Sequence, residues 1–314
     1  MYSSIPGHYR ENFNNPGDTS GSFLLMNTQT ANRVAVVTGA SSGIGKEVAR
    51  ALAARGWRII ALGRDAARSA AALADIRAAS TTGQVDMIRA DLSLLADTAR
   101  AAREVAALTD RIDVLVNNAG GMAKQQVVTS EGFEANFSGN HLGPFLLTNR
   151  LLPLLRRAAS DAPSGSVRIL NTTSDASEMI PGMDWNDLQG LEKFNAGLAY
   201  CRAKLANVLF MRGLATRLER DGIVAHAVHP GAVDSNFISY ADEGTQARFK
   251  TYNPRPVAEG ADTLIWLATE ESGVSTGGYF YNRKLRTPSP FAADPANADR
   301  LWQESEKLIA SARV

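Results

Sequence analysis

The sequence predicts an α/β fold, a single domain built on a doubly wound parallel sheet of about seven strands. From Arg33 onward, short apolar runs alternate with longer segments of helical periodicity. The apolar runs are continuous, so both faces of the sheet must be covered by helices. No internal repeat or linker interrupts this rhythm. We therefore expect one domain over residues 33–314, preceded by a flexible extension over residues 1–32 that is rich in Ser, Asn, Gly and Thr.

The elements follow one another in a regular order. The expected strands cover residues 34–38, 58–62, 85–90, 112–116, 167–171, 223–228 and 279–281. The expected helices cover residues 43–55, 65–79, 94–108, 133–159 with a bend near Pro144, 197–220 and 256–269. Two longer insertions, residues 175–196 and 232–255, are expected to form irregular loops around a substrate.

Composition excludes several classes of function. The 33 basic and 32 acidic residues leave a net charge of +1, which gives no electrostatic case for binding nucleic acid or an anionic membrane. No apolar run approaches the length of a membrane span, which is about 18 residues. The single cysteine, Cys201, rules out an internal disulfide, fits a cytoplasmic protein and is expected to be a buried, inert thiol. His226 and His229 lie at a strand end, and we expect no metal site.

A glycine-rich turn joins the first strand to the first helix. Glycines in this place permit a tight turn and let the backbone approach a pyrophosphate, which the helix N-terminus then binds. The turn alone is a weak signal, but its position between strand and helix favours a Rossmann-type dinucleotide site over a merely structural turn. The residues expected to bind the phosphates are Gly39, Ser41, Ser42, Gly43, Ile44 and Gly45.

The end of the second strand indicates which cofactor binds. Gly63 stands where a carboxylate would read the ribose of NAD, and Arg64 follows, which favours NADP over NAD. Asp65 could cap the next helix or pair with Arg64. After the third strand, Asp91 and Leu92 are expected on the adenine side, although Asp91 could instead cap the helix that follows.

Tyr200 and Lys204 are four positions apart in a predicted helix, so they share one face. Taken alone, the pair resembles an amphipathic rim with an extended lysine. A lysine ammonium near the phenol would also lower its pKa and suit the tyrosine to proton transfer near neutral pH.

Together these motifs resemble those of the short-chain dehydrogenases/reductases. They occur in the family's order: Thr38-Gly39-x-x-x-Gly43-x-Gly45, Asn117-Asn118-Ala119-Gly120, Tyr200-x-x-x-Lys204 and Pro230-Gly231. The stretches 140–143, 198–210 and 227–231 are similar to the branch of the retinol dehydrogenases and the WW-domain oxidoreductase.

The resemblance implies roles for particular residues. Tyr200 would be the general acid/base, Lys204 would bind the nicotinamide ribose and lower the pKa of Tyr200, and Ser174 would hydrogen-bond the substrate oxygen. Asn140 would help to hold a proton-relaying water chain. Further cofactor contacts would come from Asn118, Ala119, Gly120, Pro230, Gly231, Val233 and Ser235.

The expected reaction is hydride transfer between NADP(H) and a carbonyl or alcohol. Apolar residues in the two long loops suggest an apolar or aromatic small molecule, although such residues often pin loops to a core: Met179, Ile180, Met183, Trp185, Leu188, Phe194, Phe237, Ile238, Tyr240, Phe249 and Tyr252. The alternative is an NADP-binding redox sensor or interaction protein without turnover. Association of copies through the two long helices is also open.

Overall fold

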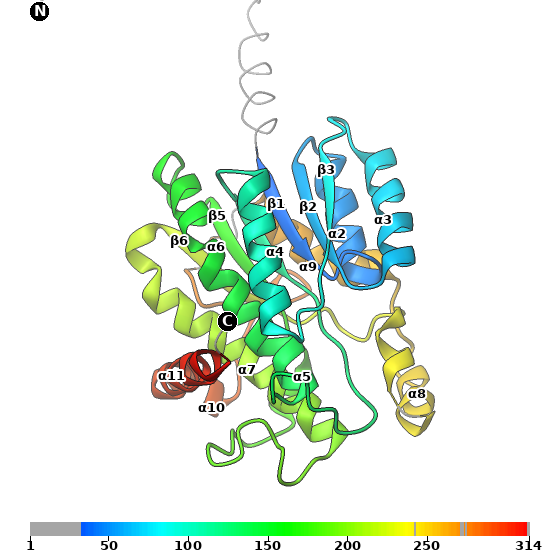
Figure 1. Cartoon of the computed structure of the whole chain (residues 1–314), viewed down its shortest axis with the longest axis vertical. Coiled ribbons are helices and arrows are strands. Elements are labelled where there is room, and N and C mark those ends of the chain that lie inside the picture. The colour runs from blue at the N-terminus through cyan, green and yellow to red at the C-terminus, as the bar shows by residue number, and fades with distance from the viewer. Residues whose placement is uncertain (1–32, 242, 271–272, 274, 313–314) are drawn as a thin grey trace, which may run out of the picture.

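A computed structural model describes residues 33–241, 243–270, 273 and 275–312, so the expected extension over residues 1–32 lies outside the described residues. Eight strands form one sheet in the order β3-β2-β1-β4-β5-β6-β7-β8 (Figure 1). They are β1 (Val34–Thr38), β2 (Arg58–Gly63), β3 (Val85–Arg89), β4 (Val114–Asn117), β5 (Val167–Thr172), β6 (Ile223–Val228), β7 (Tyr279–Tyr281) and β8 (Lys284–Arg286). Neighbouring strands from β3 through β7 pair in parallel, which confirms the prediction, and β8 adds an antiparallel edge.

Helices cover both faces of this sheet. They are α2 (Gly43–Ala53), α3 (Ala66–Ala79), α4 (Leu95–Leu108), α5 (Ala135–Phe137), α6 (Gly143–Ser160), α7 (Ala196–Arg217), α8 (Glu243–Lys250), α9 (Val257–Thr269), α10 (Pro290–Ala293) and α11 (Pro295–Ser311). Helices α4, α6 and α7 pack on one face, and α2, α3 and α9 pack on the other (Figure 1). Each face has its own apolar core, as the continuous apolar strands require.

The segment predicted as one long helix over residues 133–159 is divided. A single turn, α5, leads into a π-helical segment, Ser138–Leu142, and only then into α6. The wider turn is closed by a hydrogen bond from the amide of Gly143 to the carbonyl of Ser138. The expected bend near Pro144 is thus a π segment just before that proline, a feature often found at functional sites.

Two longer helices, α8 and α11, were absent from the prediction, as were the short elements β8 and α10. Helix α8 lies within residues 232–255, which were expected to be irregular. The C-terminal helix α11 packs against α7, and its Ser305 hydroxyl lies 2.7 Å from Nε2 of His141 in the π-helical segment. A local signal for α11 was present in the sequence, since Asp294 caps the helix and Pro295 opens it.

Candidate active site

The candidate site lies at the carboxyl ends of the parallel strands. The sheet reverses its order between β1 and β4, and the segments that follow these two strands meet there. Ligands of open α/β sheets bind at such a switch point. The turns after β1, β2, β3, β4, β5 and β6 all reach this edge, and they carry the residues that the sequence singled out.

The glycine turn packs closely against the segment that follows β4. Gly39 and Gly43 have φ values of 66° and 56°, in the left-handed region that favours glycine. A Cβ at Gly45 would lie 2.5 Å from both the Gly39 carbonyl oxygen and Nδ2 of Asn118. Ser42 precedes α2 without a side-chain capping bond, so the first amides of α2 can bind an anion.

Thr38 joins the glycine turn to the segment after β4. Its hydroxyl accepts from the amides of Asn118 and Ala119, each at 2.9 Å. Asn118 in turn donates from Nδ2 to the Thr38 carbonyl at 3.2 Å and accepts from the Thr172 hydroxyl at 3.2 Å. Thr38 belongs to the motif, but its positioning role emerges only when β1 and β4 lie side by side.

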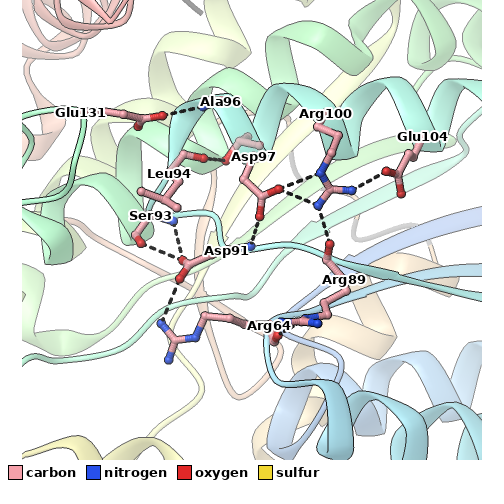
Figure 2. A network of polar contacts seen from close by, with 11 residues as sticks. Arg64, Arg89, Asp91, Ser93, Leu94, Ala96, Asp97, Arg100, Glu104 and Glu131 are labelled. Carbon is pink, nitrogen blue, oxygen red and sulfur yellow. Dashed lines mark hydrogen bonds and ion pairs between the residues drawn. The ribbon is translucent and has the colours of Figure 1, made fainter.

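The expected ribose-reading residues lie after β2 and β3 (Figure 2). The Arg64 guanidinium is 3.7 Å from the Asp91 carboxylate, which also accepts from the Ser93 amide at 3.0 Å and hydroxyl at 2.7 Å. Asp65 caps α3 by accepting from the Arg68 amide at 2.8 Å. Of the two roles left open for Asp65, the structure supports the cap.

Arginines line a pocket of about 380 Å³ at this end of the site. Arg89 donates through Nε to the Arg64 carbonyl at 3.3 Å, and Arg100 is held by the carboxylates of Asp97 and Glu104 (Figure 2). Arg89 was missed from the sequence, although a basic residue at the carboxyl end of β3 was a usable signal. The lining residues are Arg64, Arg89, Ala90, Asp91, Asp97 and Arg100.

Leu92 lies in the core, and its expected place on the adenine side stays a prediction. Its side chain is buried in the core beneath α4 and α6. A Cβ at Gly143, at the start of α6, would lie 2.1 Å from the Leu92 carbonyl oxygen. The side chain of Leu92 therefore packs the core beside α6.

Tyr200, Ser174 and Lys204 converge beside the end of β5. Tyr200 and Lys204 lie on α7, with the ammonium 5.5 Å from the centre of the phenol ring. Lys204 is buried and donates to the Thr172 carbonyl at 3.1 Å. Ser174, which follows β5, accepts from the Ala176 amide at 3.2 Å and lies within hydrogen-bonding reach of the Tyr200 phenol.

Burial dominates the electrostatics of this group. Burial raises the pKa of Tyr200, and hydrogen bonding with Ser174 only partly offsets that rise. Burial also lowers the pKa of Lys204 to about 8. Lys204 was expected to lower the pKa of Tyr200. Within the protein alone Lys204 has no such effect, because both side chains are desolvated.

Asn140 is fixed by the backbone around it. Its Nδ2 donates to the carbonyls of Gly121 at 3.0 Å and Asn136 at 2.8 Å, and its Oδ1 accepts from the Gly121 amide at 3.2 Å. A Cβ at Gly120 would lie 2.4 Å from Oδ1 of Asn140 and 3.4 Å from Nζ of Lys204. Because Gly120 has no side chain, Asn140 and Lys204 can both lie next to its backbone.

Glu134 was not predicted. It bonds to Asn136, whose carbonyl accepts a hydrogen bond from Asn140. Its buried carboxylate caps the short α5 by accepting from the amides of Asn136 at 3.0 Å and Phe137 at 2.8 Å. Desolvation raises the pKa of Glu134. An acidic residue ahead of an apolar helical run was the available signal.

The Pro230–Gly231 turn faces the glycine turn. Gly231 has a φ of 84°, and Val233, which follows it, is buried and bridges to Arg255. A Cβ at Gly43 would lie 3.4 Å from the Cβ of Ser235. The expected cofactor residues around Gly231 therefore lie close to those of the glycine turn, although the two groups are far apart in the sequence.

The two long loops divide their apolar residues between core and site. Met183 and Leu188 are buried in the core, and Ile180 and Trp185 pack against it, so these residues pin the first loop. Phe237 of the second loop instead lies beside the Tyr200 ring, with centroids 5.2 Å apart and the ring planes tilted by 44°. The apolar composition of the first loop thus says less about a substrate than we expected.

Neighbouring groups show ordinary structural behaviour. Burial raises the pKa of the Cys201 thiol, which disfavours the reactive thiolate.

Among the described residues, no helix is long and apolar enough to span a membrane. Over the same residues, no cluster of three or more His, Cys, Asp or Glu side chains could hold a metal ion.

Comparisons with known proteins agree with this geometry. Residues 33–246 match the family described as short chain dehydrogenase. The chain is 36% identical to retinol dehydrogenase 12 of Homo sapiens over 92% of this chain and 90% of that protein. It is 37% identical to human retinol dehydrogenase 13 over 88% of this chain and 84% of that protein.

Solved structures show the same fold. A protein of Mycobacterium paratuberculosis, 31% identical, superposes with a TM-score of 0.69 over 88% of this chain and 93% of its own. The Pseudomonas aeruginosa RhlG/NADP complex, 28% identical, gives a TM-score of 0.62 over 83% and 96%. The chain therefore belongs to the short-chain dehydrogenase/reductase family, whose members are nicotinamide-dependent oxidoreductases of alcohol and carbonyl groups.

Proposed function

We propose that this protein is an NADP(H)-dependent oxidoreductase that interconverts a carbonyl and an alcohol, with Tyr200 as the general acid/base. One observation carries the proposal. Tyr200 and Lys204 on α7, Ser174 after β5 and Asn140 in the π-helical segment come from three segments and lie together beside the glycine turn. A protein that only bound the cofactor would have no need of this set.

NADP, when bound, supplies or accepts the hydride, and the chain supplies orientation and proton transfer. In the reductive direction the Tyr200 hydroxyl donates its proton to the substrate oxygen, while the Ser174 hydroxyl stabilises the charge developing there. Lys204 would bind the nicotinamide ribose. Both N–H groups of the Asn140 side chain are bonded, to Gly121 and Asn136, so Asn140 would hold a water chain through its oxygen atoms.

The phenol needs positive charge nearby to act as a base. Burial raises the pKa of Tyr200, and Lys204 has a lowered pKa of about 8, so the ammonium is still largely protonated at neutral pH. Its charge and that of an oxidised nicotinamide ring would together favour the phenolate when an alcohol is oxidised.

Two features support NADP over NAD. Gly63 leaves no room for an acidic side chain, because a Cβ there would lie 2.4 Å from the Ser69 hydroxyl and 2.9 Å from the Ser41 side chain. Arg64 and Arg89 instead present positive charge to the pocket after β2 and β3. A guanidinium in this place suits a 2′-phosphate.

The substrate is proposed to be an apolar or aromatic small molecule. Phe237 beside Tyr200 supports this, as does the exposed side chain of Met179, which is 67% accessible. The retinol dehydrogenases that the chain resembles are named for an apolar alcohol. Cytoplasmic location and association into oligomers stay predictions, which cell fractionation and light scattering would test.

The test is the Tyr200→Phe variant, assayed with NADPH and a panel of aliphatic and aromatic ketones and aldehydes. We expect turnover to be lost and NADPH affinity to be largely kept, because the phenylalanine retains the ring but has no proton to give. Retained turnover would refute the assigned role. Tight NADPH binding by the wild-type protein with no turnover on any carbonyl would instead favour the redox-sensing alternative.

A further inference from the structure

His229 lies between the two loops that frame the reaction centre. It directly follows β6 and precedes the Pro230–Gly231 turn, and its side chain is only 5% exposed. Its Nδ1 accepts from the amide of Asp175 at 3.2 Å and from that of Gly231 at 3.4 Å. Asp175 is the residue after Ser174, so one imidazole contacts the catalytic-serine segment and the cofactor turn.

We propose that His229 is a positioning residue that holds Ser174 and the Pro230–Gly231 turn in register, and that it does so only as the neutral, Nε2-protonated imidazole. The inference deepens the proposed function and rests on it. It assigns no contact with substrate to His229. Its effect passes through the backbone amides of Asp175 and Gly231.

The tautomer follows from the donors. A ring nitrogen that accepts from two N–H groups must carry its lone pair, so the proton of the neutral ring is on Nε2. The ring is held flat against Tyr281, with centroids 4.8 Å apart and planes at 24°. If Nδ1 were protonated, its N–H would face the N–H groups of the two amides, and both hydrogen bonds would be lost.

Charged and titratable groups surround His229 from every neighbouring element. They are Asp175 and Glu178 after β5, Tyr279 and Tyr281 on β7, Arg286 on β8 and Arg255 before α9. Burial lowers the pKa of His229, the two arginines act in the same direction, and the two carboxylates oppose them. The neutral form is therefore favoured at physiological pH.

His226, on β6 itself, provides a matched control. It is also buried, and its Nδ1 accepts from the Gly278 amide at 3.2 Å, while burial lowers its pKa to about 4. Three residues earlier along β6, it faces the opposite side of the sheet. The two histidines thus make the same kind of bond, and only His229 makes it to the reaction centre.

The experiment compares His229→Asn, His229→Phe and His226→Asn in the full chain. Asparagine can place an acceptor near the position of Nδ1, whereas phenylalanine keeps the ring and removes the acceptor. We expect His229→Phe to lower kcat by about 10- to 100-fold at pH 7 through misplacement of Ser174, with a smaller change in the Kd for NADPH. His229→Asn should recover most of that loss, and His226→Asn should leave kcat within about twofold of wild type.

The pH profile separates positioning from mere stability. Because the pKa of His229 is lowered from 6.5, wild-type kcat should hold at pH 6.5 and fall at lower pH, as the imidazole becomes protonated. His229→Asn should keep its activity to lower pH than wild type. Unchanged kcat in His229→Phe, failure of asparagine to rescue, or the same acid limb in wild type and His229→Asn would each overturn the inference.

A readout without turnover keeps the two hypotheses distinct. Nitrogen-15 shifts of the histidine rings report the tautomer directly, and we expect an unprotonated Nδ1 at His229 at pH 7. A protonated Nδ1 overturns the inference whatever the activity. The expected tautomer in a protein that turns over no carbonyl would leave this geometry intact and refute the proposed function.

Discussion

The proposed cofactor side and the proposed substrate side of the site are built in different ways. On the cofactor side, backbone meets backbone: the turn at Gly39–Gly45 lies against Asn118 and Ala119 with no room for an added Cβ at Gly39 or Gly45. On the substrate side, side chains meet across long distances in the chain. Trp185 stacks on Phe291 at 6.1 Å, and the Arg300 guanidinium lies 4.6 Å from the Trp185 ring.

This difference predicts how each side of the site responds to amino-acid substitution. A backbone-built cradle tolerates no added atom, because the peptide groups around it cannot move independently of the sheet. A side-chain-built wall can lose a contact and relax, so it can change specificity without loss of the fold. Families of one fold vary their substrates through such loops.

The largest effect is expected from Gly45→Val. Its Cβ would meet the Gly39 carbonyl oxygen at 2.5 Å, so the cradle must open. We expect NADPH binding to weaken by at least about 100-fold, measured by fluorescence titration, together with a lower Tm. Gly213→Ala on α7 is the control, since a Cβ there would make only ordinary contacts, at 3.5 Å with Ala298 and Trp302 of α11. Comparable losses in the two variants would show that the cradle is not specially constrained.

A smaller effect on the same side is expected from Arg64→Ala. If Arg64 reads the 2′-phosphate, the Kd for NADPH should rise roughly 10- to 100-fold, as for loss of a charge-assisted hydrogen bond, while the Kd for NADH should barely change. Arg55→Ala, an exposed arginine at the end of α2, serves as the control. Equal weakening of both cofactors by Arg64→Ala would assign the arginine a structural role.

On the substrate side, Phe291→Ala should act on KM. Loss of the ring releases Trp185 and loosens the first loop, so we expect KM to rise several-fold and the unfolding free energy to fall by about 1–3 kcal/mol. The Kd for NADPH should stay unchanged. Leu285→Ala, exposed on β8, provides the control. A change in NADPH affinity without a change in KM would contradict the division between the two sides.

The smallest effect is a dependence of stability on pH. Burial lowers the pKa of His141 to about 3 and that of His226 to about 4, both below the ordinary 6.5. Below pH 6.5 the unfolded chain binds more protons than the folded one, so stability falls as the pH falls. We expect a loss of roughly 1 kcal/mol per pH unit for each buried histidine between pH 6.5 and 5. Urea unfolding of wild type and His141→Gln measures this, and equal slopes would contradict it.

Local sequence was enough for the frame of the molecule. Parallel strands buried on both faces, the glycine turn, the caps and the Tyr200–Lys204 spacing all depend on residues close together in the chain. For that reason the parallel core of the sheet and the positions of the candidate residues were predictable. The division of the helix predicted over residues 133–159, with its π segment at Ser138–Leu142, was not, because Asn140 of that segment bonds to Gly121, which is distant in the sequence.

Tertiary structure decided what each side chain does. Met183 and Leu188 could have faced a substrate or the core, and only the tertiary packing placed them in the core. The raised pKa of Tyr200 comes from burial, which no spacing reveals. His229 and the Asp175 amide are 54 residues apart and became partners because β5 and β6 are neighbours. The sequence by itself determined the type and order of the groups, whereas contacts between distant segments determined their burial, charge and partners.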